Sequence, residues 1–469
     1  MPNSTTAAGS PPNTLRVVCL GACAALTFIC FGFIFPYAPQ FGESLRLLAF
    51  TISALCLMLV DNLCDPRPRP VHLLFCVYMI VSYLLPGYFH TATGRFPFFS
   101  AGYSTGQVFN TAIVAAVFTA CVFLGYSIEF PRRALGPGRE TSPGRLRQAI
   151  LYCAIASGVC AVLYGLGALR APRGDDVFAD TIASPIKLIF GAIAHSGSFY
   201  ALMFAIILYR VQKSIAAVAI ILVTLGLFAV FNSPLAIPRS TIASYLISAF
   251  CVFFAFTRFQ KTMLTIALIA SQLTLFSYLS YLQRGDKERG FTLDPFHEYV
   301  TSGDFDGFQS TINVVAMHDG LGGKGGVNLL SAIFFFVPRA VWPEKSFGTG
   351  GESASYMGYP FINISSPLPS EFYVDFGLPG VVALSFLFGM LMKACDDYFL
   401  RYKRTNDPIG QTFVSVVAGW VFVILRGSLT GTLGPIVLSL AIGGLCHLYA
   451  TRPRESDEAA TEQAAVGSS

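Results

Sequence analysis

The chain has 469 residues, of which 54% are hydrophobic and only 12% are charged. A soluble domain carries about 25% charged residues, so the chain lacks the charge to cover the several cores that a soluble protein of this length needs. The composition excludes a cytosolic enzyme, a disordered protein and a nucleic-acid-binding protein with a basic face. The net charge of +5 becomes informative only when it is divided between the two sides of a membrane.

Twelve apolar stretches are predicted to be membrane-spanning helices, because each approaches the ~20 residues that cross a bilayer. In chain order they cover residues 15–35, 45–64, 70–89, 106–128, 148–168, 184–209, 215–233, 241–257, 262–282, 373–394, 411–427 and 430–449. With a cytoplasmic N-terminus, the inner segments hold 18 of the 31 Lys and Arg residues, as the positive-inside rule requires. Because the number of spans is even, both termini are predicted to be cytoplasmic.

The long segment of residues 283–372 lies on the outer side in this arrangement. Its apolar run from Val327 to Val337 is too short to span, so we expect a re-entrant or interfacial helix there. The predicted organisation is an N-terminal membrane bundle of nine spans (1–282), this outer loop, three C-terminal membrane helices (373–449) and a disordered cytoplasmic tail (450–469). The expected fold class is an all-α polytopic membrane protein with about 12 transmembrane helices and one large outer loop.

Motifs of soluble enzymes are scarce. The glycine run from Gly320 to Gly326 lacks the GxxxxGK[ST] spacing of a phosphate-binding loop, and neither the cysteines nor the histidines show zinc-ligand spacing. Asp304-Phe-Asp306 matches the metal-binding DxD motif of nucleotide-sugar transferases, but this motif is common by chance. It also falls on the side where nucleotide sugars are absent. We therefore expect no metal and no cofactor.

Cations on the predicted outer side are more informative, because basic residues are normally depleted there. Arginine suits phosphate, since its planar guanidinium forms two parallel hydrogen bonds and stays charged. The candidates for binding a lipid-linked diphosphate are Arg239, Arg284, Arg289, Arg339, Lys345 and Arg426. The alternative is pairing with acids of the same loop, since ten Asp and Glu and six Lys and Arg lie between Gln283 and Phe372.

Three segments of the C-terminal half carry a family resemblance. They are GDFDGFQ from Gly303, FVPRAVWPEK from Phe336 and PSEFYVDFGLPG from Pro369, together with the arginine sites Pro238-Arg239-Ser240 and Arg426-Gly427-Ser428. This set resembles the signature of bacterial Wzy-type oligosaccharide repeat-unit polymerases, which make O-antigen and exopolysaccharide. The N-terminal half is similar only in topology. Ser346 departs from the pattern, because the family often has a second proline there.

The resemblance implies a GT-C-like glycosyltransferase in the bacterial inner membrane, with the large loop in the periplasm. Its substrate would be an undecaprenyl-diphosphate-linked oligosaccharide, and its partners would be membrane lipid and a chain-length-regulating membrane protein, without nucleic acid. Such a transfer needs cations at the departing diphosphate and a base for the attacking sugar hydroxyl. The candidate bases are Glu371, the first choice because it directly precedes a span, and Asp304, Asp306 and His318.

Two other functions stay open. An O-antigen ligase has a similar architecture but transfers finished polymer to a lipid A core, and the PRxxWPxK segment favours the polymerase over it. A flippase or another transporter would place polar residues at mid-depth in the spans, whereas here the polar residues gather in one outer loop.

Overall fold

The computed structural model describes residues 13–34, 38–98, 102–129, 139–169, 185–234, 236–275 and 301–453. These residues are almost entirely helical, which confirms the predicted all-α class in its coarse form. The helices are α1 (Asn13–Ile29), η1 (Cys30–Ile34), η2 (Pro39–Phe41), α2 (Gly42–Cys64), α3 (Pro70–Tyr78), η3 (Met79–Leu84), α4 (Leu85–Thr93), α5 (Thr105–Tyr126), α6 (Pro143–Tyr164), α8 (Pro185–Gln212), α9 (Ile215–Phe231), α10 (Arg239–Phe253), α11 (Arg258–Ala270), η4 (Ser271–Leu275), η5 (Gly303–Phe305), α14 (Gly307–Leu321), α15 (Val327–Ile333), α16 (Thr349–Tyr356), α17 (Leu368–Arg404), α18 (Pro408–Arg426) and α19 (Leu429–Ala450). Two short strands, β1 (Arg139–Thr141) and β2 (Thr451–Pro453), pair antiparallel.

Eight helices of the described ranges are long and apolar enough to cross a membrane. They are Pro39–Cys64, Pro70–Thr93, Thr105–Tyr126, Pro143–Tyr164, Ile186–Gln212, Leu368–Arg404, Pro408–Arg426 and Leu429–Ala450. Three shorter apolar helices are Leu20–Gly32, Ile215–Phe231 and Arg239–Phe253. Each of the twelve predicted ranges overlaps a helix, but the count of twelve spans and the side of each terminus remain predictions.

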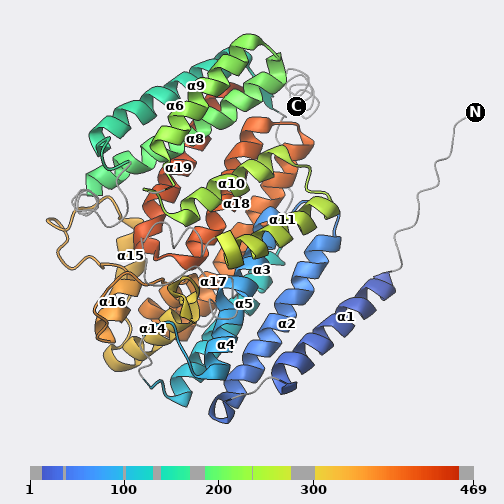
Figure 1. The fold of residues 1–469 in the computed structure, drawn as a ribbon, viewed down its shortest axis with the longest axis vertical. Coiled ribbons are helices and arrows are strands. Elements are labelled where there is room, and N and C mark those ends of the chain that lie inside the picture. Colours follow the sequence, from blue (N-terminus) through green and yellow to red (C-terminus); the bar gives the residue numbers. More distant parts are fainter. Residues whose placement is uncertain are drawn as a thin grey trace, which may run out of the picture.

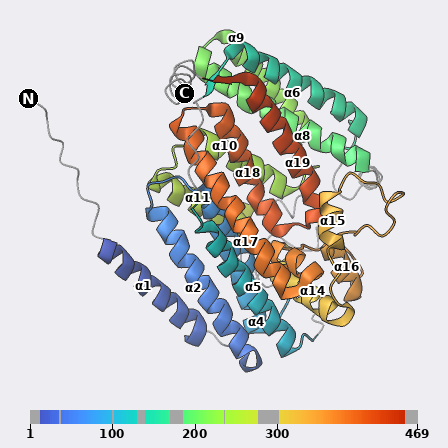
Figure 2. The same cartoon turned by 180° about the vertical axis from the view of Figure 1, so that it is seen from behind.

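The long helices lie side by side and are bordered by α1 at one edge and by α6, α8 and α9 at the other (Figures 1 and 2). In the middle, α5 packs closely on α17. A Cβ added at Gly389 of α17 would lie 2.0 Å from the carbonyl oxygen of Val122, and one added at Gly125 would lie 2.0 Å from that of Phe386. Only glycine therefore permits this backbone-to-backbone crossing, as small residues do in membrane helix pairs.

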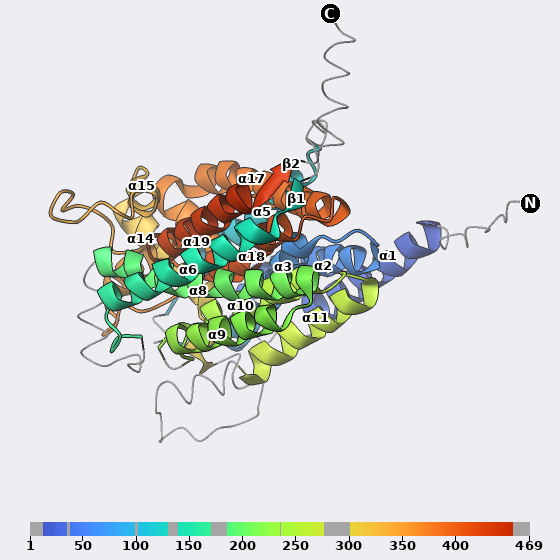
Figure 3. The same ribbon diagram turned by 90° about the horizontal axis from the view of Figure 1, so that it is seen from above.

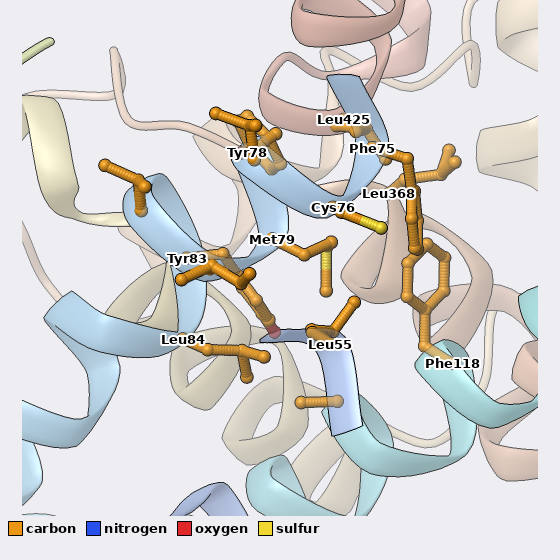
Figure 4. Close-up of a cluster of buried hydrophobic side chains, with 14 of the residues drawn as sticks. Leu55, Phe75, Cys76, Tyr78, Met79, Tyr83, Leu84, Phe118, Leu368 and Leu425 are labelled. Carbon is orange, nitrogen blue, oxygen red and sulfur yellow. The ribbon is translucent and has the colours of Figure 1, made fainter. Parts of the chain in front are cut away.

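One large hydrophobic cluster joins helices from both halves of the chain. Figure 4 shows part of it, in which Leu55, Phe75, Phe118, Leu368 and Leu425 converge from α2, α3, α5, α17 and α18. The rings of Phe75 and Phe118 are 6.1 Å apart between centroids. A second cluster joins α6, α8, α10, α18 and α19. Because α18 contributes to both clusters, it connects the two parts of the bundle.

A buried carboxylate of α17 caps the start of α3. Asp396 accepts hydrogen bonds from the backbone N–H groups of Val71 at 2.9 Å and His72 at 3.1 Å, and from the Tyr126 hydroxyl at 2.8 Å. These N–H groups have no partner within their own helix. The cap therefore fixes α3 against α5 and α17 through a residue that is far away in the sequence.

Residues 301–367 pack onto the bundle and do not form a separate unit. Most of α14 is buried and contacts α4, α5 and α17, while α15 contacts α17 and α19. The apolar run predicted over Val327–Val337 forms a seven-residue helix that ends at Ile333. Figure 3 shows α14 and α15 on one side of the molecule and the strands β1 and β2 on another.

We name the two ends of the bundle after Arg426 and Asp407, the residues at the two ends of α18. At the Arg426 end, α18 ends, α19 begins and α10 begins close by. At the Asp407 end, α17 and α19 end, α18 begins, and β2 follows α19. The positive-inside prediction assigns the Arg426 end to the outer side of the membrane and the Asp407 end to the cytoplasmic side.

Candidate functional site

Asp304 brings two of the predicted arginines together at the Arg426 end. Arg239, the first residue of α10, donates from Nη1 to Oδ2 of Asp304 at 3.0 Å and from Nη2 to Oδ1 at 2.9 Å. Arg426, the last residue of α18, has its Nη2 3.7 Å from the same Oδ1 and 3.5 Å from the Gly303 carbonyl oxygen. Three segments that are distant in the sequence therefore meet at one carboxylate.

The two arginines differ in how accessible they are. The side chains of Arg239 and Asp304 are 9% and 4% exposed, whereas that of Arg426 is 29% exposed. A buried bidentate pair is held tightly, because breaking it leaves an uncompensated charge. Two guanidinium groups share the carboxylate of Asp304, and the carboxylate of Asp306 also lies close to Arg426. Arg426 is the more accessible of the two cations.

Asp306 lies beside this arrangement and is held by Ser365. The backbone N–H of Ser365 donates to Oδ2 of Asp306 at 2.9 Å, and the Ser365 hydroxyl donates to Oδ1. Burial raises the pKa of Asp306, although the positive charge of Arg426 partly opposes that effect. The next residue, Ser366, donates its backbone N–H to the carbonyl oxygen of Arg426 at 3.2 Å. This short segment therefore connects Asp306 to Arg426.

Glu371 lies in the first turn of α17 and is 3% exposed. Its carboxyl group faces the hydroxyls of Ser366, Thr349 and Ser428 and the backbone N–H of Leu429, at the start of α19. Its Oε1 makes no hydrogen bond with a described residue. A buried carboxyl oxygen without a partner is uncommon and often marks a functional position.

A break in α17 separates the Glu371 segment from the rest of the helix. Gly377 has φ 62° and ψ −151°, and Pro379 follows within the same helix. Glycine adopts this backbone conformation without the steric penalty that a side chain brings. The break lets the first turns of α17 present Glu371 to the start of α19.

Lys345 does not join this cluster through any described contact. Its Nζ donates to the carbonyl oxygens of Phe334 at 3.0 Å, Phe335 at 2.9 Å and Val337 at 2.9 Å. An ammonium group has three donors, so all three are used to cap the end of α15. Burial, together with the nearby Arg339, lowers the pKa of Lys345.

Arg339 also contacts its own loop. It donates from Nη1 to the carbonyl oxygen of Lys345 and from Nη2 to that of Ser346 at 2.7 Å. Its guanidinium carbon lies 3.6 Å from the ring centroid of Phe347, which adds a cation–π contact. The PRxxWPxK segment is therefore a loop stabilised by its own two cations.

The other predicted residues lie elsewhere. His318 is in the last turn of α14, where its ring centroid is 4.8 Å from that of Tyr373. It follows Asp306 by twelve positions along a helix that rises 1.5 Å per residue, so the two are about 18 Å apart. Arg284 and Arg289 lie outside the described residues.

The polar residues that surround the candidate bases were not predicted. The hydroxyls beside Glu371 and Asp306 carry no motif of their own, and Ser428 was noted only as a neighbour of an arginine. A second acid of the region, Glu352 of α16, forms an ion pair with Lys324 and accepts from the Ser346 hydroxyl at 2.7 Å. Burial alone raises the pKa of Glu352, but the hydrogen bonds from Lys324 and Ser346 outweigh it and hold that pKa below its usual value.

The chain was also compared with known proteins. The search of protein-family models, of curated proteins and of solved structures finds no match. The family resemblance therefore stays a prediction from the quoted segments. Within the described ranges, no three His, Cys, Asp or Glu residues come together as a metal site.

Proposed function

We propose that this protein polymerises lipid-diphosphate-linked oligosaccharide repeat units at the Arg426 end, on the periplasmic face of a bacterial inner membrane. The observation that supports this proposal most directly is the position of Arg426. This cation is partly exposed, lies beside Asp304, and is connected through Ser366 to the carboxyl group of Glu371, whose Oε1 has no hydrogen-bond partner among the described residues. The resemblance of the three C-terminal segments supports the same substrate class.

The reaction is a glycosyl transfer. The bond between the anomeric carbon of the growing chain and its lipid diphosphate breaks, and the diphosphate leaves with the electron pair. A hydroxyl oxygen of the incoming repeat unit forms the new bond to that carbon, and its proton passes to a base. Negative charge therefore grows on the diphosphate while a proton leaves the nucleophile, and a fixed cation and a carboxylate lower the barrier for these two changes.

Each residue of the cluster has a role in this proposal. Arg426 stabilises the departing diphosphate, since its guanidinium has donors beyond its contacts to Asp304 and Gly303. Arg239 is a positioning residue, because both of its terminal nitrogens bind Asp304. Glu371 is the base. Its Oε1 is buried and accepts no hydrogen bond from the described residues, so one acceptor of the carboxyl group is unused.

The test uses the full chain expressed in a strain that lacks its own copy, with analysis of lipid-linked sugars and surface glycan. Arg426→Ala and Glu371→Gln are expected to reduce polymer at least 100-fold while membrane insertion stays normal. Arg95→Ala is the matched control. Arg95 is exposed and precedes Phe98, which contacts Gln309 near the same end of the bundle.

The product distribution separates the candidate functions. Loss of a polymerase leaves single repeat units that are still transferred to the surface. Loss of a ligase leaves long polymer on the lipid, and loss of a flippase traps single units on the inner face. Normal polymer from both Arg426→Ala and Glu371→Gln contradicts the proposed site.

A further inference from the structure

An apolar patch lies on the surface of the molecule at the Arg426 end, on α15 and on the chain that follows it. Its members are large apolar side chains that the protein leaves exposed: Leu330, Ile333, Phe334, Phe336, Val341 and Phe347. Val341 and Phe347 are 75% and 76% exposed. Figures 1 and 2 show the chain after α15 projecting away from the helices. Large exposed apolar patches mark sites of interaction with another protein or with a membrane.

The loop that carries the patch satisfies its own backbone carbonyl groups. Lys345 donates to three carbonyl oxygens within residues 334–337, and Arg339 donates to those of Lys345 and Ser346. In water, such carbonyl groups are hydrated and need no partner from the protein. Beside lipid, an unsatisfied carbonyl group is costly, so irregular backbone there must find its donors within the protein. The two cations therefore suit this loop to a place where water is scarce.

The patch is attached to a helix that is able to cross a membrane. α15 packs on α19, and a Cβ added at Gly434 of α19 would lie 2.8 Å from the ring of Phe335. α19 is apolar, is long enough to span, and is mostly not buried by the protein. Gly434 follows the first residue of α19 by about 8 Å along the helix. Interfacial elements bury their apolar side chains about 5–10 Å deep, so the patch is level with that layer.

We infer that this patch inserts into the boundary of the lipid acyl chains at the Arg426 end and anchors residues 330–347 to the membrane surface. The half-buried Trp342 of the same loop is typical of the membrane–water interface, where its ring is apolar and its N–H is wet. The exposed Glu344 lies at the level of the headgroups. The sequence predicts an interfacial helix over Val327–Val337, whereas here the loop after Ile333 carries most of the patch.

The test measures which surroundings reach a single tryptophan in the full chain, reconstituted in phosphatidylcholine nanodiscs that leave both faces open to water. The two native tryptophans are replaced by phenylalanine, and Phe336→Trp supplies the reporter. Bromine on the acyl chains quenches a tryptophan that touches lipid, and dissolved iodide quenches one that touches water. The reporter is expected to lose at least half of its fluorescence in brominated nanodiscs. The control is Asp319→Trp, because Asp319 is an exposed acid in the last turn of α14, and iodide is expected to quench it at least threefold more strongly.

Each outcome decides the inference. Quenching of Phe336→Trp by iodide but not by brominated lipid places the patch in water and overturns the proposal. Protection from both quenchers assigns the patch to a second copy of the chain and also overturns it. If Phe336→Trp does not fold, Phe347→Trp replaces it as the reporter, since it keeps an aromatic ring beneath Arg339, and the same results apply. The measurement needs no enzymatic activity, so the proposed function and this anchor fail independently.

Discussion

Replacing Lys345 by Met tests whether this lysine stabilises its loop or serves the diphosphate. The substitution keeps the length of the side chain and removes three hydrogen bonds to the end of α15. At about 1 kcal/mol for each bond, the loop loses about 3 kcal/mol.

The assay uses the fluorescence of Trp342, which lies three residues before Lys345. The chain has two tryptophans, and a Trp420→Phe background isolates the one in the loop. For a chain of 469 residues, a loss of about 3 kcal/mol lowers the midpoint of thermal unfolding by about 3 °C. The matched control is Lys393→Met, which breaks a pair with Asp397 within one helix worth at most about 0.5 kcal/mol.

Two results would refute this reasoning. One is a Trp342 transition in Lys345→Met that equals the transition in the lysine control. The other is a full loss of polymer with no change in the Trp342 transition, since Lys345 would then act on the substrate.

Three further predictions concern helix packing, capping and pH. Gly389→Leu is expected to reduce the yield of monodisperse protein at least fivefold, because the new side chain forces α5 away from α17. The control is Gly158→Leu, which is expected to leave the yield unchanged because a Cβ added at Gly158 has no atom within 4 Å. Asp396→Ala removes three hydrogen bonds and is expected to lower the free energy of unfolding by about 3 kcal/mol. Asp397→Ala, at the exposed neighbouring position, is expected to change it very little, and thermal unfolding measures both. Hydrogen bonds hold the pKa of Glu352 below its ordinary 4.5, so its stabilisation is present above about pH 4.5 and is lost as the pH falls through the lowered pKa. Glu352→Gln is therefore expected to melt below the wild type at pH 7 and to match it in more acidic buffer, and parallel melting curves at all pH values would contradict this.

The apolar helices could be predicted from the sequence because hydropathy alone determines where they lie. The ends of the helices were harder to predict from the sequence. The stretch predicted as 373–394 became part of a helix from Leu368 to Arg404, because polar residues at both ends are buried or paired. The helix α14 was not predicted, since it is rich in polar residues. Gln309 and Asn313 are buried there through hydrogen bonds to Tyr103, which no periodicity indicates.

Residue type could select candidates for the site, but it could not indicate their contacts. Residue type identified Arg239, Arg426, Asp304 and Glu371, and the structure brings these four into one region. The same criterion also selected Lys345, whose donors bind the carbonyl groups of its own loop. A cation that binds the carbonyl groups of its own loop and a partly exposed cation such as Arg426 have the same sequence signal, so only the contacts separate them.

The crossing of α5 and α17 at Gly125 and Gly389 has a mechanical consequence. Backbone touches backbone there, with no flexible side chain between the helices that could absorb a sliding motion. Below the crossing, Asp396 of α17 holds the start of α3. The part of α17 after the break is thus held rigidly, and Gly377 is the position in that helix where the backbone leaves the helical conformation. A movement of the segment that carries Glu371 relative to the rest of α17 would therefore have its hinge at Gly377.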